Sequence, residues 1–170
     1  MVNSLFINWQ ICTILKNEKS FIELKKVAFA FCNEFVNARI LRIRTQITEI
    51  ENALTSETKS SAGDKHETGR AMIQLEREKL GVQLAEAEKM KQLLSKVPLN
   101  TTSETVGLGS FVFTDQGNYY IAISAGAGKV NQESFFCISV ATPIGKLLLG
   151  KRKGDTFNFN QKAFQILNFG

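Results

Sequence analysis

The sequence predicts an α+β protein in which a long antiparallel helical coiled-coil hairpin precedes a small β-rich domain. Two observations predict this class. Apolar residues recur at alternating spacings of four and three, and no glycine or proline occurs between residues 21 and 62. After Pro98 the composition changes sharply towards Gly, Phe, Val and Ile. We expect four parts: a poorly ordered leader over residues 1–20, the hairpin over 21–97 with its tip at 59–69, a linker over 98–105, and the β-rich domain over 106–170.

The first expected helix covers residues 25 to 56. Its apolar positions form a seam typical of a coiled coil, and charged residues such as Arg39 and Arg42 lie between them, as suits a solvated outer face. At about 1.5 Å per residue the helix would be roughly 48 Å long, which is too long for a small globular domain. The seam consists of Phe29, Cys32, Val36, Ile40, Ile43, Ile47, Ile50 and Leu54.

The second expected helix begins between Asp64 and Thr68 and ends near Lys96. Pro98 ends it, because proline lacks an amide donor and disfavours helix in the residue before it. Its apolar face consists of Ile73, Leu80, Leu84, Ala87 and Leu94. Opposite charges three residues apart should support it at two places, Glu76 with Lys79 and Glu86 with Lys89. Since the connection is short, the two helices must run antiparallel.

The β-rich domain is predicted from short apolar runs bounded by turn residues. One short helix is expected over residues 143–149, before Gly150. Strands are expected over residues 106–114, 119–124, 134–140, 156–160 and 164–169.

Two glycine-rich segments of this domain resemble nucleotide-binding loops only superficially. The run from Gly126 to Lys129 lacks the first glycine of a phosphate loop, and Val130 replaces the Ser or Thr that would hold magnesium. We therefore predict a turn that connects two strands. Gly107-Leu108-Gly109 lacks the third glycine and the helix of a dinucleotide fingerprint, and is also predicted to be a turn.

Composition limits the class of protein. The chain has 170 residues, 44% of them hydrophobic, and a formal net charge of +5, which permits a nucleic-acid or acidic partner without requiring one. Its three cysteines, Cys12, Cys32 and Cys137, lie far apart without CxxC spacing, so neither a disulfide framework nor a thiolate metal site is indicated. The run from Leu5 to Leu15 is too short to span a membrane. We expect a cytoplasmic protein.

The expected tip carries two carboxylates, Asp64 and Glu67. Their i,i+3 spacing around a helix start projects them to one side, where they could share one hard cation. Two carboxylates alone do not make a tight magnesium site, so this would be half a site, completed by a partner or substrate. The alternative is a structural role. Acids at a helix N-terminus interact favourably with the helix dipole, and exposed acids also aid solubility.

These segments together resemble the bacterial Gre transcript-cleavage factors of RNA polymerase. The family's coiled-coil tip reads Gly-Asp-x-x-Glu-Asn, and this chain reads Gly63-Asp64-Lys65-His66-Glu67-Thr68. The family's C-terminal domain carries an Ile-Ser…Ser-Pro-Ile-x-x-x-Leu-x-Gly-Lys-x-x-Gly-Asp pattern. Here Ile138-Ser139 is followed by Thr142-Pro143-Ile144 and by Gly150-Lys151-Arg152-Lys153-Gly154-Asp155. The resemblance covers about residues 25 to 170.

The resemblance implies a fold, a partner and a mechanism. The C-terminal domain would be similar to FK506-binding proteins and would dock on bacterial RNA polymerase, with Pro143 and Ile144 as the candidate docking surface. The coiled coil would enter the secondary channel, where Asp64 and Glu67 would hold a Mg²⁺ jointly with the polymerase. The backtracked 3′ segment of the RNA would then be hydrolysed. The polymerase would remain the enzyme, and the factor would be a monomer when free.

The tip departs from the family pattern at three positions. Lys65 stands where leucine is usual, His66 follows it, and Thr68 replaces asparagine. Lys65 could weaken metal affinity or contact RNA phosphate, and His66 could shuttle protons or face solvent. Three functions therefore remain open: a cleavage factor, a secondary-channel regulator that does not provoke cleavage, and a coiled-coil adaptor without a role at the polymerase.

Overall fold

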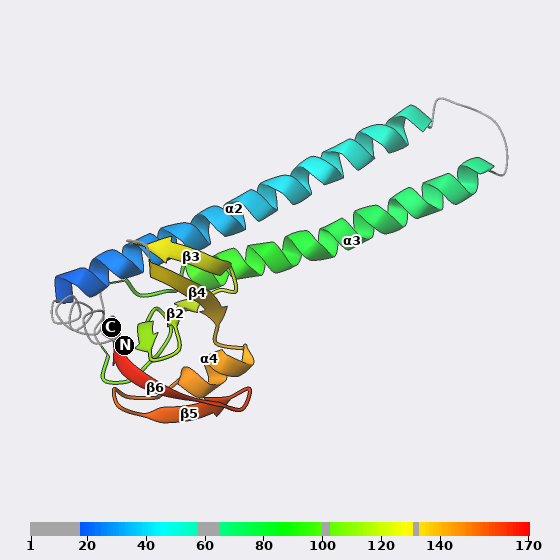
Figure 1. Cartoon of the computed structure of the whole chain (residues 1–170). Coiled ribbons are helices and arrows are strands. Elements are labelled where there is room, and N and C mark those ends of the chain that lie inside the picture. The colour runs from blue at the N-terminus through cyan, green and yellow to red at the C-terminus, as the bar shows by residue number, and fades with distance from the viewer. Residues whose placement is uncertain (1–17, 58–64, 100–102, 131–132) are drawn as a thin grey trace. The chain divides into compact units, whose positions relative to one another are not determined.

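The computed structural model describes residues 18–57, 65–99, 103–130 and 133–170 (Figure 1). Two long helices, α2 (Glu18–Glu57) and α3 (Lys65–Leu94), precede the sheet domain. The α+β class, with a helical hairpin before a β-rich domain, is confirmed. The sheet domain contains β1 (Phe111–Thr114), β2 (Asn118–Ala122), β3 (Gly126–Val130), β4 (Glu133–Ser139), α4 (Pro143–Leu148), β5 (Thr156–Phe159) and β6 (Lys162–Phe169).

The expected leader lies outside the described residues, except that residues 18–20 belong to α2. By their contacts the residues form two compact units. The sheet unit lies within Met1–Asn33 and Leu93–Gly170, and the hairpin unit comprises Glu34–Gln92. The first sixteen described residues of α2 therefore pack with the sheet, and the remainder of that helix packs with α3.

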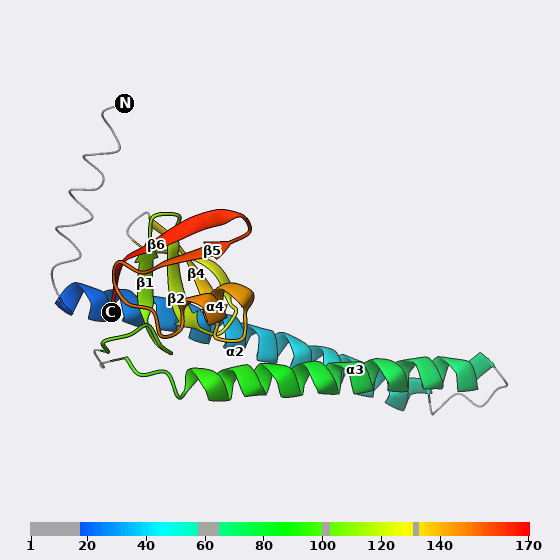
Figure 2. The same cartoon turned by 90° about the horizontal axis from the view of Figure 1, so that it is seen from below.

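Within the hairpin unit the helices run antiparallel (Figure 2). Arg44 of α2 contacts Glu88 of α3 at 3.0 Å, and Glu51 contacts Arg77 at 2.9 Å, so residue numbers rise on one helix as they fall on the other. The expected ion pair between Glu76 and Lys79 forms at 3.5 Å. The pair expected between Glu86 and Lys89, both described, does not form. The buried seam positions of this unit are Val36, Ile40, Ile43, Leu80 and Ala87.

The six strands form one sheet in the order β3-β4-β2-β1-β6-β5. Every neighbouring pair is antiparallel except β2 and β4, which run parallel with Tyr120 opposite Cys137 and Ile121 opposite Ile138. α4 contributes Ile144 and Leu148 to a core that also contains Val106, Val112, Tyr119, Ile121, Ile138, Phe157, Phe164 and Ile166.

β3 corrects the prediction of a simple turn at Gly126 to Lys129. The segment pairs along its length with β4, including Gly128 opposite Phe135. Phe135 is 1% exposed, and a Cβ on Gly128 would lie within 3.0 Å of its ring. Gly128 therefore leaves space for a core ring, and this packing explains why a glycine occurs in a strand rather than in a turn.

β1 begins at Phe111, later than the predicted start at residue 106. Val106 instead exchanges backbone hydrogen bonds with Gly150 and Lys151, each at 2.8 Å. Gly109 then takes a positive φ of 86°, which turns the chain and confirms the predicted turn at residues 107–109.

None of the described helices is long and apolar enough to cross a membrane.

Candidate functional site at the hairpin turn

The predicted acids Asp64 and Glu67 fall at the beginning of α3. That helix starts at Lys65, so Asp64 is the residue before it and Glu67 is its third residue. Asp64 and the side chain of Glu67 lie outside the described part of the chain. That the two carboxylates bind one magnesium ion together therefore stays a prediction, which rests on their spacing around this helix start. Elsewhere in the described part, no three His, Cys, Asp or Glu residues gather as a metal site would require.

The start of α3 also suits a capping role for the same two acids. An aspartate directly before a helix and a glutamate at its third position have the spacing of a capping box, in which each side chain accepts a hydrogen bond from a backbone N–H. Both carboxylates would also face the positive end of the helix dipole. A test of their chemistry must therefore remove their charge without removing their capacity to cap.

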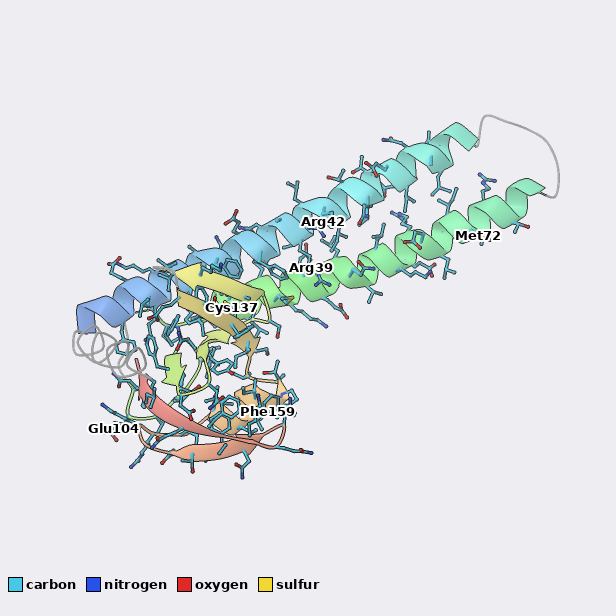
Figure 3. All side chains as sticks on the ribbon, in the orientation of Figure 1. Arg39, Arg42, Met72, Glu104, Cys137 and Phe159 are labelled. Atoms are coloured by element: carbon cyan, nitrogen blue, oxygen red, sulfur yellow. The ribbon has the colours of Figure 1, made fainter. Side chains whose placement is uncertain are left out.

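The hairpin unit carries a cationic cavity of about 480 Å³ that sequence reasoning missed. Arg39 and Arg42, both labelled in Figure 3, line it and form no ion pair with any described residue. Arg39 is half-buried, although we expected both arginines on a solvated outer face. Their sequence context held the signal, since no acid lies three or four positions from either. The remaining lining residues are Phe35, Ala38, Ile43, Gln46 and Gln83.

The proposed docking residues lie at the start of α4. Pro143 is exposed and occupies the first helical position, where its missing N–H costs nothing, whereas Ile144 is 8% exposed and belongs to the core. Thr142 caps the helix: its Oγ1 accepts from the Gly145 N–H at 3.1 Å and donates to the Ser139 carbonyl at 2.7 Å. Of the two docking candidates, Pro143 is the one whose side chain reaches the surface.

Comparisons with known proteins identify no family for this chain. No family model matches the sequence, and no curated protein matches it. Among solved structures, the chain is similar to one described as "Structure of the transcription factor Gfh1", with 21% identity over 80% of this chain and 91% of that chain. The TM-score is 0.32, so this likeness carries no argument about what the present chain does.

Proposed function

We propose that this protein is a transcription elongation factor that binds bacterial RNA polymerase and stimulates Mg²⁺-dependent cleavage of backtracked RNA. The observation that carries the proposal is the long helical hairpin whose second helix starts immediately after Asp64 in a Gly-Asp-x-x-Glu segment. Within the hairpin unit α2 contributes residues 34–57 and α3 contributes residues 65–92, which correspond to lengths of about 36 and 42 Å. Helices of this length suit a probe that carries chemistry at its turn into a deep channel.

In this proposal the chain supplies ligands and position, and the polymerase supplies the rest of the catalytic centre. Asp64 and Glu67 offer hard carboxylate oxygens, which suit Mg²⁺, but they leave most of its coordination sphere to water and partner groups. A Mg²⁺ ion bound there would activate the attacking water, and a second Mg²⁺ held by the polymerase would stabilise the leaving oxygen of the RNA. The two acids would hold and orient that ion only while the hairpin occupies the channel. The chain alone is therefore expected not to hydrolyse RNA.

The cavity on the hairpin supports an anionic partner. Arg39 and Arg42 place two cationic side chains beside the amides of Gln46 and Gln83, and no described carboxylate neutralises them. Guanidinium groups bind phosphate with paired hydrogen bonds. This arrangement suits a partner complex that contains RNA.

Lys65 and His66 favour a second candidate, a regulator that binds the polymerase without provoking cleavage. A cation next to Asp64 opposes the binding of a second cation, and the capping role described above gives both acids a reason to be present without a metal. On this alternative the hairpin would occupy the channel and tune initiation.

Transcript shortening in a stalled, backtracked complex of the cognate polymerase tests the proposal. Wild-type protein should bind the complex and shorten the RNA only when Mg²⁺ is present. Binding without shortening would replace the proposal by the regulator, and absence of binding would leave a coiled-coil adaptor. RNA incubated with the protein alone is the control and should stay intact.

A further inference from the structure

Two cysteines far apart in the sequence meet inside the sheet unit. Cys32 belongs to α2, and Cys137, which is labelled in Figure 3, belongs to β4. Their side chains are 0% and 3% exposed, and the two thiols hydrogen-bond to each other. Cys32 was expected in the seam between the helices, and the structure instead places its thiol against the sheet. Neither cysteine is in a disulfide.

A buried phenol with no partner lies close to this pair. Tyr120 is fully buried, and its hydroxyl is the buried side-chain polar atom that lacks a hydrogen bond among the described residues. Tyr120 lies opposite Cys137 in the register of β2 and β4, and both sulfurs act on it electrostatically. Burial raises the pKa of Tyr120, so it stays an O–H donor. An unmatched buried donor is costly unless negative charge develops beside it.

The hydrogen bond between the two thiols makes the titration of each depend on the other. The Cys32 sulfur accepts hydrogen bonds from the Cys137 thiol and from the backbone N–H of Ile123, and these lower the pKa of Cys32 against the opposing effect of burial. The same thiol–thiol hydrogen bond, together with burial, raises the pKa of Cys137. The thiolate is the reactive form of cysteine. Whichever of the two sulfurs is deprotonated is therefore the nucleophile, and the other thiol reacts second.

We propose that Cys32 and Cys137 are a redox pair that a small hydroperoxide, such as hydrogen peroxide, converts into a disulfide joining α2 to β4. Only a small oxidant suits thiols that are this deeply buried. Disulfides of proteins in reducing compartments are usually transient and serve redox sensing. The disulfide would attach the N-terminal part of α2 covalently to β4 of the sheet.

The reaction balances in two steps. The thiolate of one cysteine attacks one peroxide oxygen, the O–O bond breaks, and the departing hydroxide takes the thiol proton to form water, which leaves that cysteine as a sulfenic acid. The sulfur of the other cysteine then attacks the oxidised sulfur, the S–O bond breaks, and the hydroxide leaves with the proton of the second thiol as a second water. Two thiols lose two electrons to one peroxide. In this proposal the unpartnered Tyr120 hydroxyl would donate to the charged sulfur or to the sulfenate oxygen.

The test uses the full chain with Cys12→Ser, which removes the third thiol. The folded protein is treated with hydrogen peroxide, unfolded, and reacted with a maleimide, and its mass is measured. We expect loss of two hydrogens with no maleimide added, reversal by a dithiol reductant, and a melting temperature about 5 to 10 °C higher in the oxidised form. The added variant Cys32→Ala should give no cross-link. Two free thiols after oxidation, or sulfinic acid at one cysteine with the other free, would overturn the proposal.

Tyr120→Phe tests whether the pair is built for this chemistry or merely packs in the core. Phenylalanine keeps the ring and removes only the unpartnered hydroxyl, so the fold should persist. We expect the cross-link to form several-fold more slowly in this variant, while the melting temperature of the reduced protein is unchanged or higher. An unchanged rate of cross-linking would overturn the role assigned to Tyr120.

Discussion

The sheet unit and the hairpin unit are stabilised in different ways. In the sheet unit aromatic rings interlock, and Phe111 alone lies 5.1 to 6.2 Å from the rings of Phe113, Tyr120 and Phe135. All ring contacts among the described residues fall in this unit. The hairpin unit has a narrow aliphatic seam instead, in which Ile47, Ile50, Leu54 and Ile73 are only half-buried.

This difference assigns distinct tasks to the two units. A core of interlocked rings loses much free energy when one side chain is truncated, because rigid neighbours cannot fill the space. A pair of helices with a narrow apolar seam can be long while burying little apolar surface per residue. Local separation of its helices therefore costs less free energy than local unfolding of the sheet core. The hairpin is therefore suited to reach and adaptation, and the sheet unit to a fixed shape.

The largest expected effect compares one substitution in the two units. Ile121 is 0% exposed and lies in the sheet core, whereas Ile50 is half-buried in the seam. Ile121→Ala should lower the free energy of unfolding by about 4 kcal/mol, and Ile50→Ala by about 1 kcal/mol. Urea denaturation of the two variants checks both values, with near-ultraviolet circular dichroism monitoring the aromatic rings and far-ultraviolet circular dichroism monitoring the helices. Equal losses would erase the distinction between the units.

Glycine-to-alanine substitutions should have opposite signs in the two units. A Cβ on Gly145 of α4 would collide with the Ser139 carbonyl oxygen and with Thr142 Oγ1, so Gly145→Ala should destabilise by about 2 kcal/mol. Gly81 lies within α3 with nothing within 4 Å of an added Cβ. Gly81→Ala should therefore stabilise by about 0.5 to 1 kcal/mol. Thermal unfolding of both variants gives the comparison, and a gain at Gly145 would contradict the close packing of α4.

Alkaline pH should weaken the sheet unit in particular. Burial raises the pKa of Tyr120 in the folded chain above the value of about 10 in the unfolded chain. As the pH rises, the Tyr120 hydroxyl therefore loses its proton in the unfolded chain before it does so in the folded chain. The contribution of Tyr120 to the free energy of unfolding is complete below pH 10. Above pH 10 this contribution declines by at most about 1.4 kcal/mol per pH unit. Tyr120→Phe should make this decline shallower in urea titrations from pH 8 to about 11. A decline of unchanged steepness would show that Tyr120 does not contribute.

The smallest expected effect concerns the ion pairs of the hairpin. The side chains of Arg77 and Glu51 are 55% and 48% exposed, so water and salt screen their contact. Arg77→Ala should cost about 0.5 kcal/mol at low ionic strength and less at high salt. A loss of several kcal/mol that persists in high salt would mean that this pair, rather than the seam, holds the helices together.

The long elements could be predicted from the sequence because their periodicity is strong. The seam from Val36 to Ile43 and the stop at Pro98 correspond to α2 and α3, and the strands richest in Phe, Tyr and Ile lie where they were expected. Periodicity marks a buried helix face without identifying what covers it. Cys32 fits the helical seam by spacing, yet its thiol meets Cys137 of β4.

Features that depend on tertiary contacts could not be predicted in this way. β3 contains Gly126 and Gly128, which disfavour strands in isolation, and pairing with β4 beneath the Phe135 ring overrides that preference. At the candidate site, the sequence indicated the two acids and their place at a helix start. The cavity at Arg39 and Arg42 depends on the partner helix as well, because Gln83 of α3 forms part of its wall.

The most direct test of the central claim separates charge from capping at the hairpin turn. Asp64→Asn keeps an equally good helix cap and removes the anionic ligand, and Glu67→Gln does the same at the third position of α3. Transcript shortening is measured at saturating factor in a backtracked polymerase complex, with far-ultraviolet circular dichroism and binding as controls. The proposal predicts that each variant folds and binds like the wild type while the rate of shortening falls about 100-fold or more. Shortening at the wild-type rate by both variants would contradict it.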